Sequence, residues 1–155
     1  MSDTDLREVY IDIESNGSFV ERLGPLSSSR LEAHIEEQKI VIKPGWRIEV
    51  TPEVDTWVRN AVRVLGQGFL LLIDYGYEAR ELYSATHSQG TVATYSHHQV
   101  ETTNKTTAAP WLIEPGSRDI TAHVNLTAVK SAAESAGATT LGILDQTYFL
   151  LGLGA

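Results

Sequence analysis

The sequence predicts an α/β fold for this chain of 155 residues. An amphipathic helix over about residues 52–65 leads into a run of five apolar residues, from Phe69 to Ile73. Such a run does not alternate, which is typical of a strand covered on both faces by helices. A second helix and a further strand follow between about residues 125 and 144. Helices that alternate with buried strands define the α/β class.

The first predicted element is a hairpin. Apolar residues alternate with polar ones from Val9 to Ile13, the period-2 pattern of a half-buried strand. Asn16 and Gly17 follow, and this pair favours a type I′ turn because it readily supplies two positive φ angles. A return strand over about residues 19–23 completes the hairpin.

Capping residues mark where the helices begin. Ser29 starts a capping-box pattern, which predicts a short helix to about Gln38. Thr51 is the predicted N-cap of the next helix, with Pro52 at its first position and Gly66 at its end. Brief strands are predicted at 40–42, 47–50, 92–95, 120–124 and near 139–144, and two further helices after Asn125 and Asp145.

Composition excludes several classes of protein. The chain has 12 basic and 20 acidic residues and a formal charge of −8, whereas binding to a phosphate backbone needs clustered Lys and Arg. It has no cysteine, which excludes a disulfide scaffold and a thiol nucleophile. No apolar run approaches the roughly 20 residues that span a bilayer. We therefore expect a cytoplasmic protein with no membrane span and no nucleic-acid partner.

Candidate site residues follow the apolar run. Ligands of open α/β sheets bind beyond the carboxyl ends of the strands, where Asp74, Tyr75, Gly76 and Tyr77 stand. An acid that emerges from an apolar strand can act as a base, a ligand anchor or a water-orienting group, and Gly76 permits close backbone approach. The alternative is that Asp74 caps a nearby loop or helix.

The histidines do not have the spacing of a metal site. His97 and His98 are adjacent, so in a strand they would point to opposite faces and could not serve one metal ion. A site made of His97, Asp119 and His123 is the alternative, but no known ligand spacing supports it. The prediction is that the chain binds no metal.

The glycines do not predict a cofactor loop. A nucleotide-type cofactor usually sits on a glycine-rich turn that follows a strand and precedes a helix. Gly66 and Gly68 stand in the opposite order, after a helix and before the apolar run. No cofactor-binding residue is therefore predicted from the residues themselves.

Several motifs together resemble the MidA family of class I S-adenosylmethionine-dependent methyltransferases, which includes the mitochondrial factor that assists respiratory complex I assembly. The most specific motif is PGSRDITAHVN at 115–125. Further blocks lie in family order over nearly the whole chain, at 8–11, 47–50, 68–78, 90–98 and 146–154. The family's Tyr-x-x-His-Arg block has Gln99 at its last position here.

The resemblance implies a Rossmann-like sheet with strand order 3-2-1-4-5-7-6, of which this chain would hold the C-terminal half. The chain would be a single partial domain, with an inserted β-hairpin region over 1–50 and the C-terminal strands and helices over 51–155. In the family, the glycine-rich loop that binds S-adenosyl-L-methionine lies in the N-terminal half. We therefore expect the main cofactor-binding loop to be absent from this chain.

The resemblance also implies transfer of a methyl group to an arginine of a partner protein, with a link to complex I assembly. Asp74 and Tyr75 are the expected catalytic residues, and the expected substrate residues are Gly76, Tyr77, His98, Asp119 and His123. A non-catalytic, truncated binding or assembly module is the alternative, and a histidine-based metallohydrolase is a third reading.

The predicted strand from Phe69 to Ile73 has a consequence for partners. In the family it pairs with a strand that this chain lacks, so its backbone groups would form a bare apolar edge. We expect the chain to pair through this edge with a separate polypeptide that carries the N-terminal half, or with a second copy of itself as a homodimer.

Overall fold

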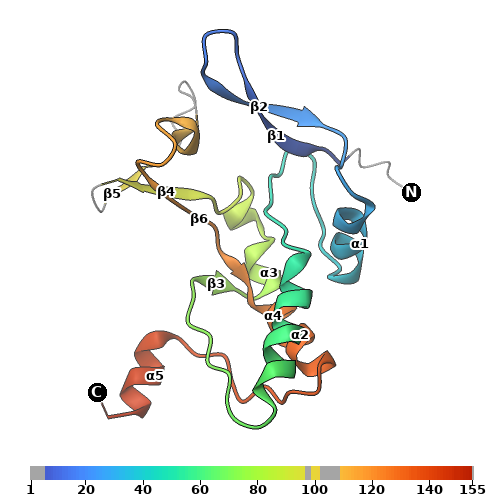
Figure 1. The fold of residues 1–155 in the computed structure, drawn as a ribbon, viewed down its shortest axis with the longest axis vertical. Helices are drawn as coiled ribbons and strands as arrows, with labels where there is room; N and C mark the ends of the chain where they lie inside the picture. Colours follow the sequence, from blue (N-terminus) through green and yellow to red (C-terminus); the bar gives the residue numbers. More distant parts are fainter. Residues whose placement is uncertain (1–5, 97–98, 102–108, 155) are drawn as a thin grey trace. The chain divides into compact units, whose positions relative to one another are not determined.

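The computed structural model describes residues 6–96, 99–101 and 109–154 of the chain (Figure 1). Helices and strands both occur along it, in agreement with the predicted α/β class. The chain divides into two compact units, each built from two stretches of sequence. The first unit comprises Met1–Val50 and Tyr83–His123, and the second comprises Thr51–Leu82 and Val124–Ala155.

The predicted hairpin is confirmed in the first unit. Strands β1 (Glu8–Ile13) and β2 (Phe19–Gly24) pair antiparallel. The turn differs from the predicted type I′, because only Gly17 of the central pair has a positive φ, 85°. The Asn16 side chain instead accepts a hydrogen bond from the backbone N of Ser18, at 2.8 Å, and so holds a longer loop.

The first helix, α1 (Ser29–Glu37), is capped one residue earlier than predicted. Ser28 is the N-cap, and its hydroxyl accepts from the backbone N of Arg30 at 3.1 Å. The strands predicted at 40–42 and 47–50 are wrong. Neither stretch has a neighbouring strand in the described part of the chain, and the one bridge there joins Arg47 to Gln89.

A small antiparallel sheet forms the rest of the first unit. Its strands are β4 (Ala93–Ser96), β5 (Gln99–Glu101) and β6 (Asp119–Thr121), in the order β5-β4-β6. Two short 3-10 helices precede β4 and β6 in the sequence, η1 (Ala85–His87) and η2 (Pro110–Leu112). Thr94 in the central strand is fully buried. The strand predicted at 92–95 is confirmed. The one predicted at 120–124 is divided between β6 and β7 (Val124–Asn125).

Two helices form the core of the second unit. Helix α2 (Glu53–Leu65) packs against α4 (Leu126–Ser135) (Figure 1). Val58 of α2 is fully buried. Ala128 and Ala132 are the buried residues of α4, and their small side chains are one helical turn apart on the same face. The helix predicted over residues 52–65 is confirmed, and of its predicted apolar stripe Val58 is buried whereas Trp57 is 56% exposed.

The helix caps of the second unit match the predictions in part. Asn125 caps α4 as predicted, because its Oδ1 accepts from the backbone N of Ala128 at 3.1 Å. Pro52 rather than Thr51 occupies the N-cap position of α2, and no side chain caps that helix. Asp145 is the N-cap residue of α5 (Gln146–Gly152) but makes no capping hydrogen bond.

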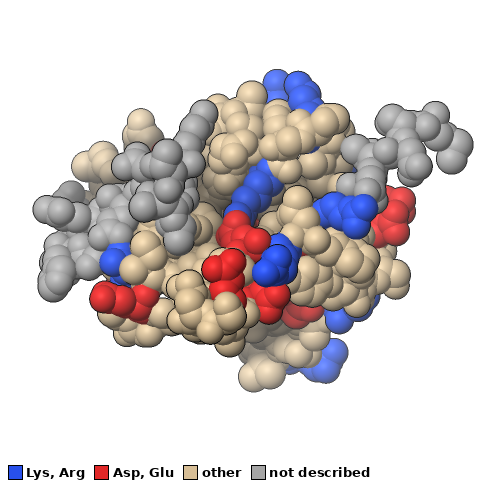
Figure 2. Space-filling model, turned by 90° about the horizontal axis from the view of Figure 1, so that it is seen from above, with Lys and Arg blue, Asp and Glu red and all other residues tan. Residues whose placement is uncertain are grey.

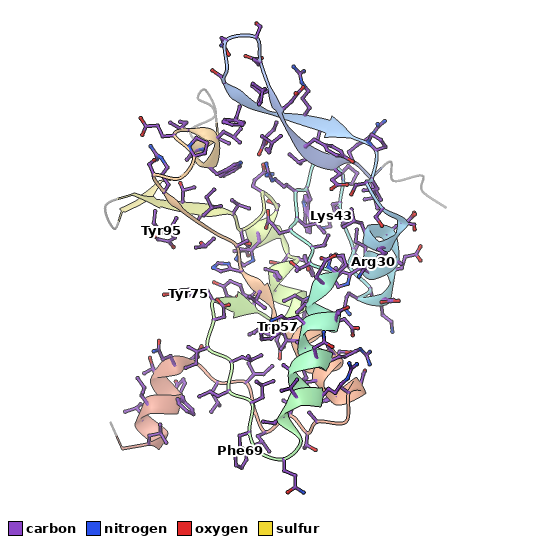
Figure 3. The ribbon with its side chains drawn as sticks, in the orientation of Figure 1. Arg30, Lys43, Trp57, Phe69, Tyr75 and Tyr95 are labelled. Atoms are coloured by element: carbon purple, nitrogen blue, oxygen red, sulfur yellow. The ribbon has the colours of Figure 1, made fainter. Side chains whose placement is uncertain are left out.

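The apolar run from Phe69 to Ile73 is neither a strand nor buried, which corrects the prediction of a covered strand. Phe69 is 84% exposed, and Figure 3 shows its side chain directed away from the ribbon. The strand predicted near 139–144 is also absent, and Leu141 is 79% exposed. The physical reason is the same in both places: no second strand of the described residues pairs with either segment.

Two short elements connect the apolar run to the helices. Strand β3 (Gly76–Tyr77) pairs parallel with β7, and α3 (Ala79–Leu82) follows directly. The backbone N of Ala79 donates to the Thr127 hydroxyl of α4 at 2.9 Å, which anchors the start of α3. Within the described residues, no helix is long and apolar enough to cross a membrane.

Candidate functional site

The predicted catalytic pair lies in the second unit, on the segment that leads into β3. Asp74 is exposed, and its Oδ1 accepts from the backbone N of Tyr75 at 2.7 Å. The Tyr75 side chain is 79% exposed and points away from the ribbon in Figure 3. The Tyr75 carbonyl accepts from the backbone N of Val124 at 2.8 Å. A fixed backbone therefore presents two exposed polar side chains at one point of the chain.

Gly76 is required by this arrangement. A Cβ atom at this position would lie 2.5 Å from the backbone O of Val124 and 3.1 Å from Cγ of Leu126. The close approach lets β3 pair with β7 in parallel register, with Gly76 opposite Val124 and Tyr77 opposite Asn125. The sequence predicted that Gly76 permits a close backbone approach. In the structure the group that approaches is the Val124 carbonyl, which occupies the space beside the glycine.

The remaining predicted site residues belong to the first unit or lie outside the residues that the structure describes. Asp119 is exposed in β6, opposite Tyr95 of β4. His123 is half-buried, and its ring packs edge-on to His87 with centroids 6.2 Å apart. His98 lies outside the described residues. The structure therefore groups Asp74 with its three successors in one unit, and Asp119 with His123 in the other.

A polar cluster that the sequence did not predict lies in the first unit and centres on Arg47. The Arg47 Nη1 donates to both carboxylate oxygens of Glu21, at 2.9 and 2.8 Å. The indole N–H of Trp111 donates to the same carboxylate at 2.9 Å. The guanidinium also lies over the Trp111 ring, with 5.0 Å between Cζ and the ring centroid. This cluster ties β2 to η2 through charge, hydrogen bonds and a cation–π contact.

A second chain of contacts joins Glu49 to His123 through Thr91. Glu49 Oε2 accepts from the backbone N of Thr91 at 2.7 Å and from its hydroxyl at 3.0 Å. The same hydroxyl oxygen accepts from the backbone N of His123 at 3.0 Å. Glu49 Oε1 is buried without a hydrogen bond and lies 3.9 Å from Nε of Arg47. The backbone of His123 is therefore held by a side-chain relay that begins at a charged pair.

Sequence separation explains why these two groups of contacts were missed. Glu21 and Arg47 are 26 residues apart, Glu49 and Thr91 are 42 apart, and Glu21 and Trp111 are 90 apart. No helical or strand period links such positions. One signal was available: Arg47 and Glu49 are two residues apart, and in an extended chain such residues share a face.

Neither a metal site nor a uniform basic surface is apparent in the described part of the chain. No group of three or more His, Asp or Glu side chains among the described residues could hold a metal ion. The face drawn in Figure 2 carries basic side chains beside acidic ones. Opposite charges also pair on the hairpin, where Arg22 Nε lies 2.7 Å from Oδ2 of Asp12.

Comparison with known proteins defines the class of this chain. Residues 1–144 match the family described as "Putative S-adenosyl-L-methionine-dependent methyltransferase". The match covers most of the sequence, and the chain belongs to this family. No curated protein matches the chain.

Two crystal structures of COG1565 superfamily proteins from Burkholderia thailandensis have a similar fold. One contains S-adenosyl-homocysteine; it is 29% identical, with a TM-score of 0.82 over 98% of this chain and 37% of that one. The other is a high-resolution native structure, 31% identical, with a TM-score of 0.80 over 96% of this chain and 37% of that one. This chain thus spans little more than a third of the length of either relative.

The turn at Gly66 and Gly68 does not have the arrangement of a nucleotide-cofactor loop. Gly66 and Gly68 have positive φ angles of 65° and 141°, but they follow α2 and precede the apolar run. A helix N-terminus is the usual partner of such a glycine turn, and here none follows it directly. We therefore do not assign Gly66 or Gly68 to cofactor binding.

Proposed function

We propose that this chain forms the substrate-binding part of a protein methyltransferase of the MidA type, which transfers a methyl group from S-adenosylmethionine to arginine. The observation that carries the proposal is the similarity of 98% of the chain, at 29% identity, to a relative that holds S-adenosyl-homocysteine. On the MidA resemblance, the main cofactor-binding loop is proposed to lie outside this chain, which spans 37% of that relative.

Asp74 and Tyr75 are the proposed catalytic residues. The exposed Asp74 carboxylate can accept charge-assisted hydrogen bonds from a guanidinium, and such pairs are strong and geometrically specific. It would orient the guanidine nitrogen and receive the proton that this nitrogen loses when the N–methyl bond forms. The exposed Tyr75 ring would stack on the same guanidinium. His98, Asp119 and His123 are proposed as further substrate residues on the resemblance alone.

A complex I subunit is the proposed protein substrate, again on the MidA resemblance. The chain's charge of −8 supports an arginine-bearing partner, because opposite charges favour encounter. Mass spectrometry of complex I from cells with and without this chain tests the assignment. Loss of one arginine methylation without the chain is the expected result, and an unchanged methylation pattern would reject this substrate.

The activity itself is tested by reconstitution. The chain is combined with the non-matching portion of the S-adenosyl-homocysteine-bound relative, and methyl transfer to an arginine peptide is measured against the same peptide with lysine. We expect transfer to arginine only, reduced about 100-fold or more by Asp74→Asn, a loss typical of one acid–base group. Asp145→Asn, an exposed acid in the same unit without a capping hydrogen bond, is the matched control.

A non-catalytic binding or assembly module is the second candidate. The observation that favours it is the poor fit of the described glycines to the cofactor. A binding module predicts tight association with the partner protein and no methyl transfer under any reconstitution. Association that is unchanged by Asp74→Asn, together with absent transfer, would decide for the module.

A further inference from the structure

The hairpin of the first unit has an exposed apolar face. Side chains alternate between the two faces of a strand, so Ile11 and Ile13 of β1 lie on the same face as Leu23 of β2. These three side chains are 51%, 62% and 72% exposed. The opposite face carries the Arg22–Asp12 ion pair instead. The apolar face is therefore the side of the hairpin that gains most from being covered by a partner.

The hairpin also has unpaired strand edges. Among the described residues, β1 and β2 form a sheet of two strands, and no third strand pairs with either of them (Figure 1). The backbone N of Glu14 donates to the carbonyl of Ser18 at 2.9 Å, and hydrogen-bonded pairs alternate along antiparallel strands. The next pair, Ile13 and Phe19, therefore directs its backbone N–H and C=O groups away from the hairpin, and every second pair does the same.

The two edges are not equally open. On β1, the backbone N of Ile13 donates to Oδ1 of Asp12 at 2.8 Å, so a side chain already takes one of the places that an added strand would need. On β2, the outward residues are Phe19, Glu21 and Leu23. No such side-chain contact closes this edge in the described part of the chain. The outer edge of β2 is therefore the better site for an added strand.

The charge of the hairpin indicates the kind of partner. Residues 8–24 contain four acidic side chains and one basic side chain, a formal charge of −3. The ion pair of Glu21 with Arg47 reduces this to −2. A second copy would bring the same negative charge to the edge, whereas a basic segment would be attracted to it. An extended segment in which basic residues alternate with apolar ones fits both the charge and the apolar face.

We propose that the outer edge of β2 binds an extended, arginine-bearing segment of the protein substrate, which adds to the hairpin as a third strand. Backbone hydrogen bonds to Phe19, Glu21 and Leu23 would supply affinity, and apolar side chains of the segment would extend the exposed apolar face. The inference rests on the proposed function for the identity of the segment, whereas the strand addition itself does not require methyl transfer.

NMR of the isotope-labelled chain tests the proposal with synthetic peptides of about ten residues, the length of a long strand. The first peptide alternates arginine with valine. At a concentration of 100 times Kd, exchange of the amides of Phe19, Glu21 and Leu23 should slow about 100-fold. The amides of Val9 and Ile11, on the β1 edge, should not slow. Added salt should weaken binding, because it screens the charges.

Two altered peptides separate the backbone contribution from the charge contribution. A peptide with an N-methyl group on every amide keeps the side chains and the charge but has no backbone donor, so it should not slow exchange. A peptide with glutamate in place of arginine keeps the backbone donors but reverses the charge, and it should bind about 10-fold or more weakly than the arginine peptide.

Leu23→Pro and Val9→Pro form a matched pair of variants. The two residues lie opposite each other and both N–H groups point outward, so each proline removes a donor from one edge and leaves the β1–β2 hydrogen bonds in place. Leu23→Pro should abolish the slowing at Phe19 and Glu21, whereas Val9→Pro should retain it. A slowly exchanging Glu14 amide shows that the hairpin is intact. Where a variant loses the hairpin, the N-methylated peptide decides, because it leaves the chain unchanged.

Four results would overturn the proposal. The first is slowing on the β1 edge instead of the β2 edge, and the second is equal binding of the N-methylated peptide. The third is equal loss of slowing in both proline variants with the hairpin intact. The fourth is protection of the β2 edge in the chain alone as a dimer in light scattering, which would assign this edge to a second copy.

Failure of this surface and failure of the proposed activity give different results. Peptide binding on the β2 edge without methyl transfer in the reconstituted enzyme would leave the surface in place and reject the activity. Methyl transfer to the arginine–valine peptide that Leu23→Pro does not weaken would reject the surface and leave the activity in place.

Discussion

The Arg47 guanidinium bridges both carboxylate oxygens of Glu21 at 2.9 and 2.8 Å while it lies over the ring of Trp111. Both charged side chains are about a quarter exposed, at 29% and 27%. Because the pair is partly buried, removing one partner should cost more folding free energy than it would at a fully exposed pair. The remaining charge would stay partly desolvated without the interaction that offsets its desolvation.

We predict that Arg47→Lys destabilises the first unit by about 1–3 kcal/mol, since lysine can neither donate in the same planar geometry nor stack on Trp111 in the same way. Urea unfolding followed by the NMR signal of the Trp111 indole N–H measures the change. Arg22→Lys is the control: its partner Asp12 is about half exposed, so a loss below ~1 kcal/mol is expected. Equal losses in the two variants would contradict the special role of Arg47.

Thr91→Val should destabilise the first unit by about 1–3 kcal/mol, because Glu49 loses a donor and the backbone N of His123 loses its acceptor. The valine side chain has nearly the same shape, so packing is little changed. Thr91→Ser keeps the hydroxyl and should recover most of the loss. Thermal unfolding of the three proteins measures this, and a serine variant as unstable as the valine variant would show that packing, not the relay, is responsible.

Gly90→Ala should be more harmful than Gly17→Ala, although the two glycines have similar φ angles of 80° and 85°. Both substitutions carry the backbone cost of a side chain in left-handed geometry, about 1–2 kcal/mol. A Cβ at position 90 would also collide with the Glu49 carboxylate, whereas nothing lies within 4 Å at position 17. The measurement is the difference in the free energy of unfolding, and equal values would contradict the predicted contact.

The hairpin should weaken in acid. The pKa of the Asp12 carboxyl is lowered because the backbone N–H of Ile13 and the Arg22 guanidinium donate to it. The pKa of Glu8 is lowered mainly because the backbone N–H of Ser27 donates to it. A lowered folded-state pKa stabilises the hairpin above the ordinary value, and this stabilisation is lost as the pH falls through the folded value.

Amide exchange of β1 and β2 measured from pH 6 down to about pH 2 checks this dependence, since the ordinary values are 3.8 for Asp12 and 4.5 for Glu8. The hairpin amides should open progressively below about pH 4.5. The double variant Glu8→Gln with Asp12→Asn should open less steeply over this range. A slope identical to that of the unchanged chain would show that these two carboxyls do not carry the effect.

Local patterns predicted the elements whose stability is local. The hairpin, helix α2 and the Asn125 cap of α4 each depend on residues within about two turns or one strand pair, and each is present. The positions of the caps of α1 and α2 were off by one residue, because neighbouring Ser28 and Pro52 could occupy the same role.

Features that depend on distant parts of the chain were not predictable in this way. The continuous apolar run at residues 69–73 indicates a strand covered on both faces, but whether covering elements and neighbouring strands are present is a property of the whole fold. The Arg47 cluster depends on the contacts of Glu21 with Arg47 and Trp111, which are 26 and 90 residues away from it in the sequence. No periodic pattern of residues indicates contacts at such separations. The site residues Asp74 and Tyr75 were located by their place after the apolar run, and their chemical roles stay predictions.

The exposed segment from Phe69 to Ile73 also bears on the lifetime of this chain in a cell. Apolar stretches with unpaired backbone are the stretches that chaperones hold and that proteases reach first. Burial of this segment would remove both liabilities, so the abundance of the chain should follow that of whatever covers it. Degradation would then remove copies of the chain in which this segment stays uncovered, and so keep the amount of the chain equal to that of its covering partner.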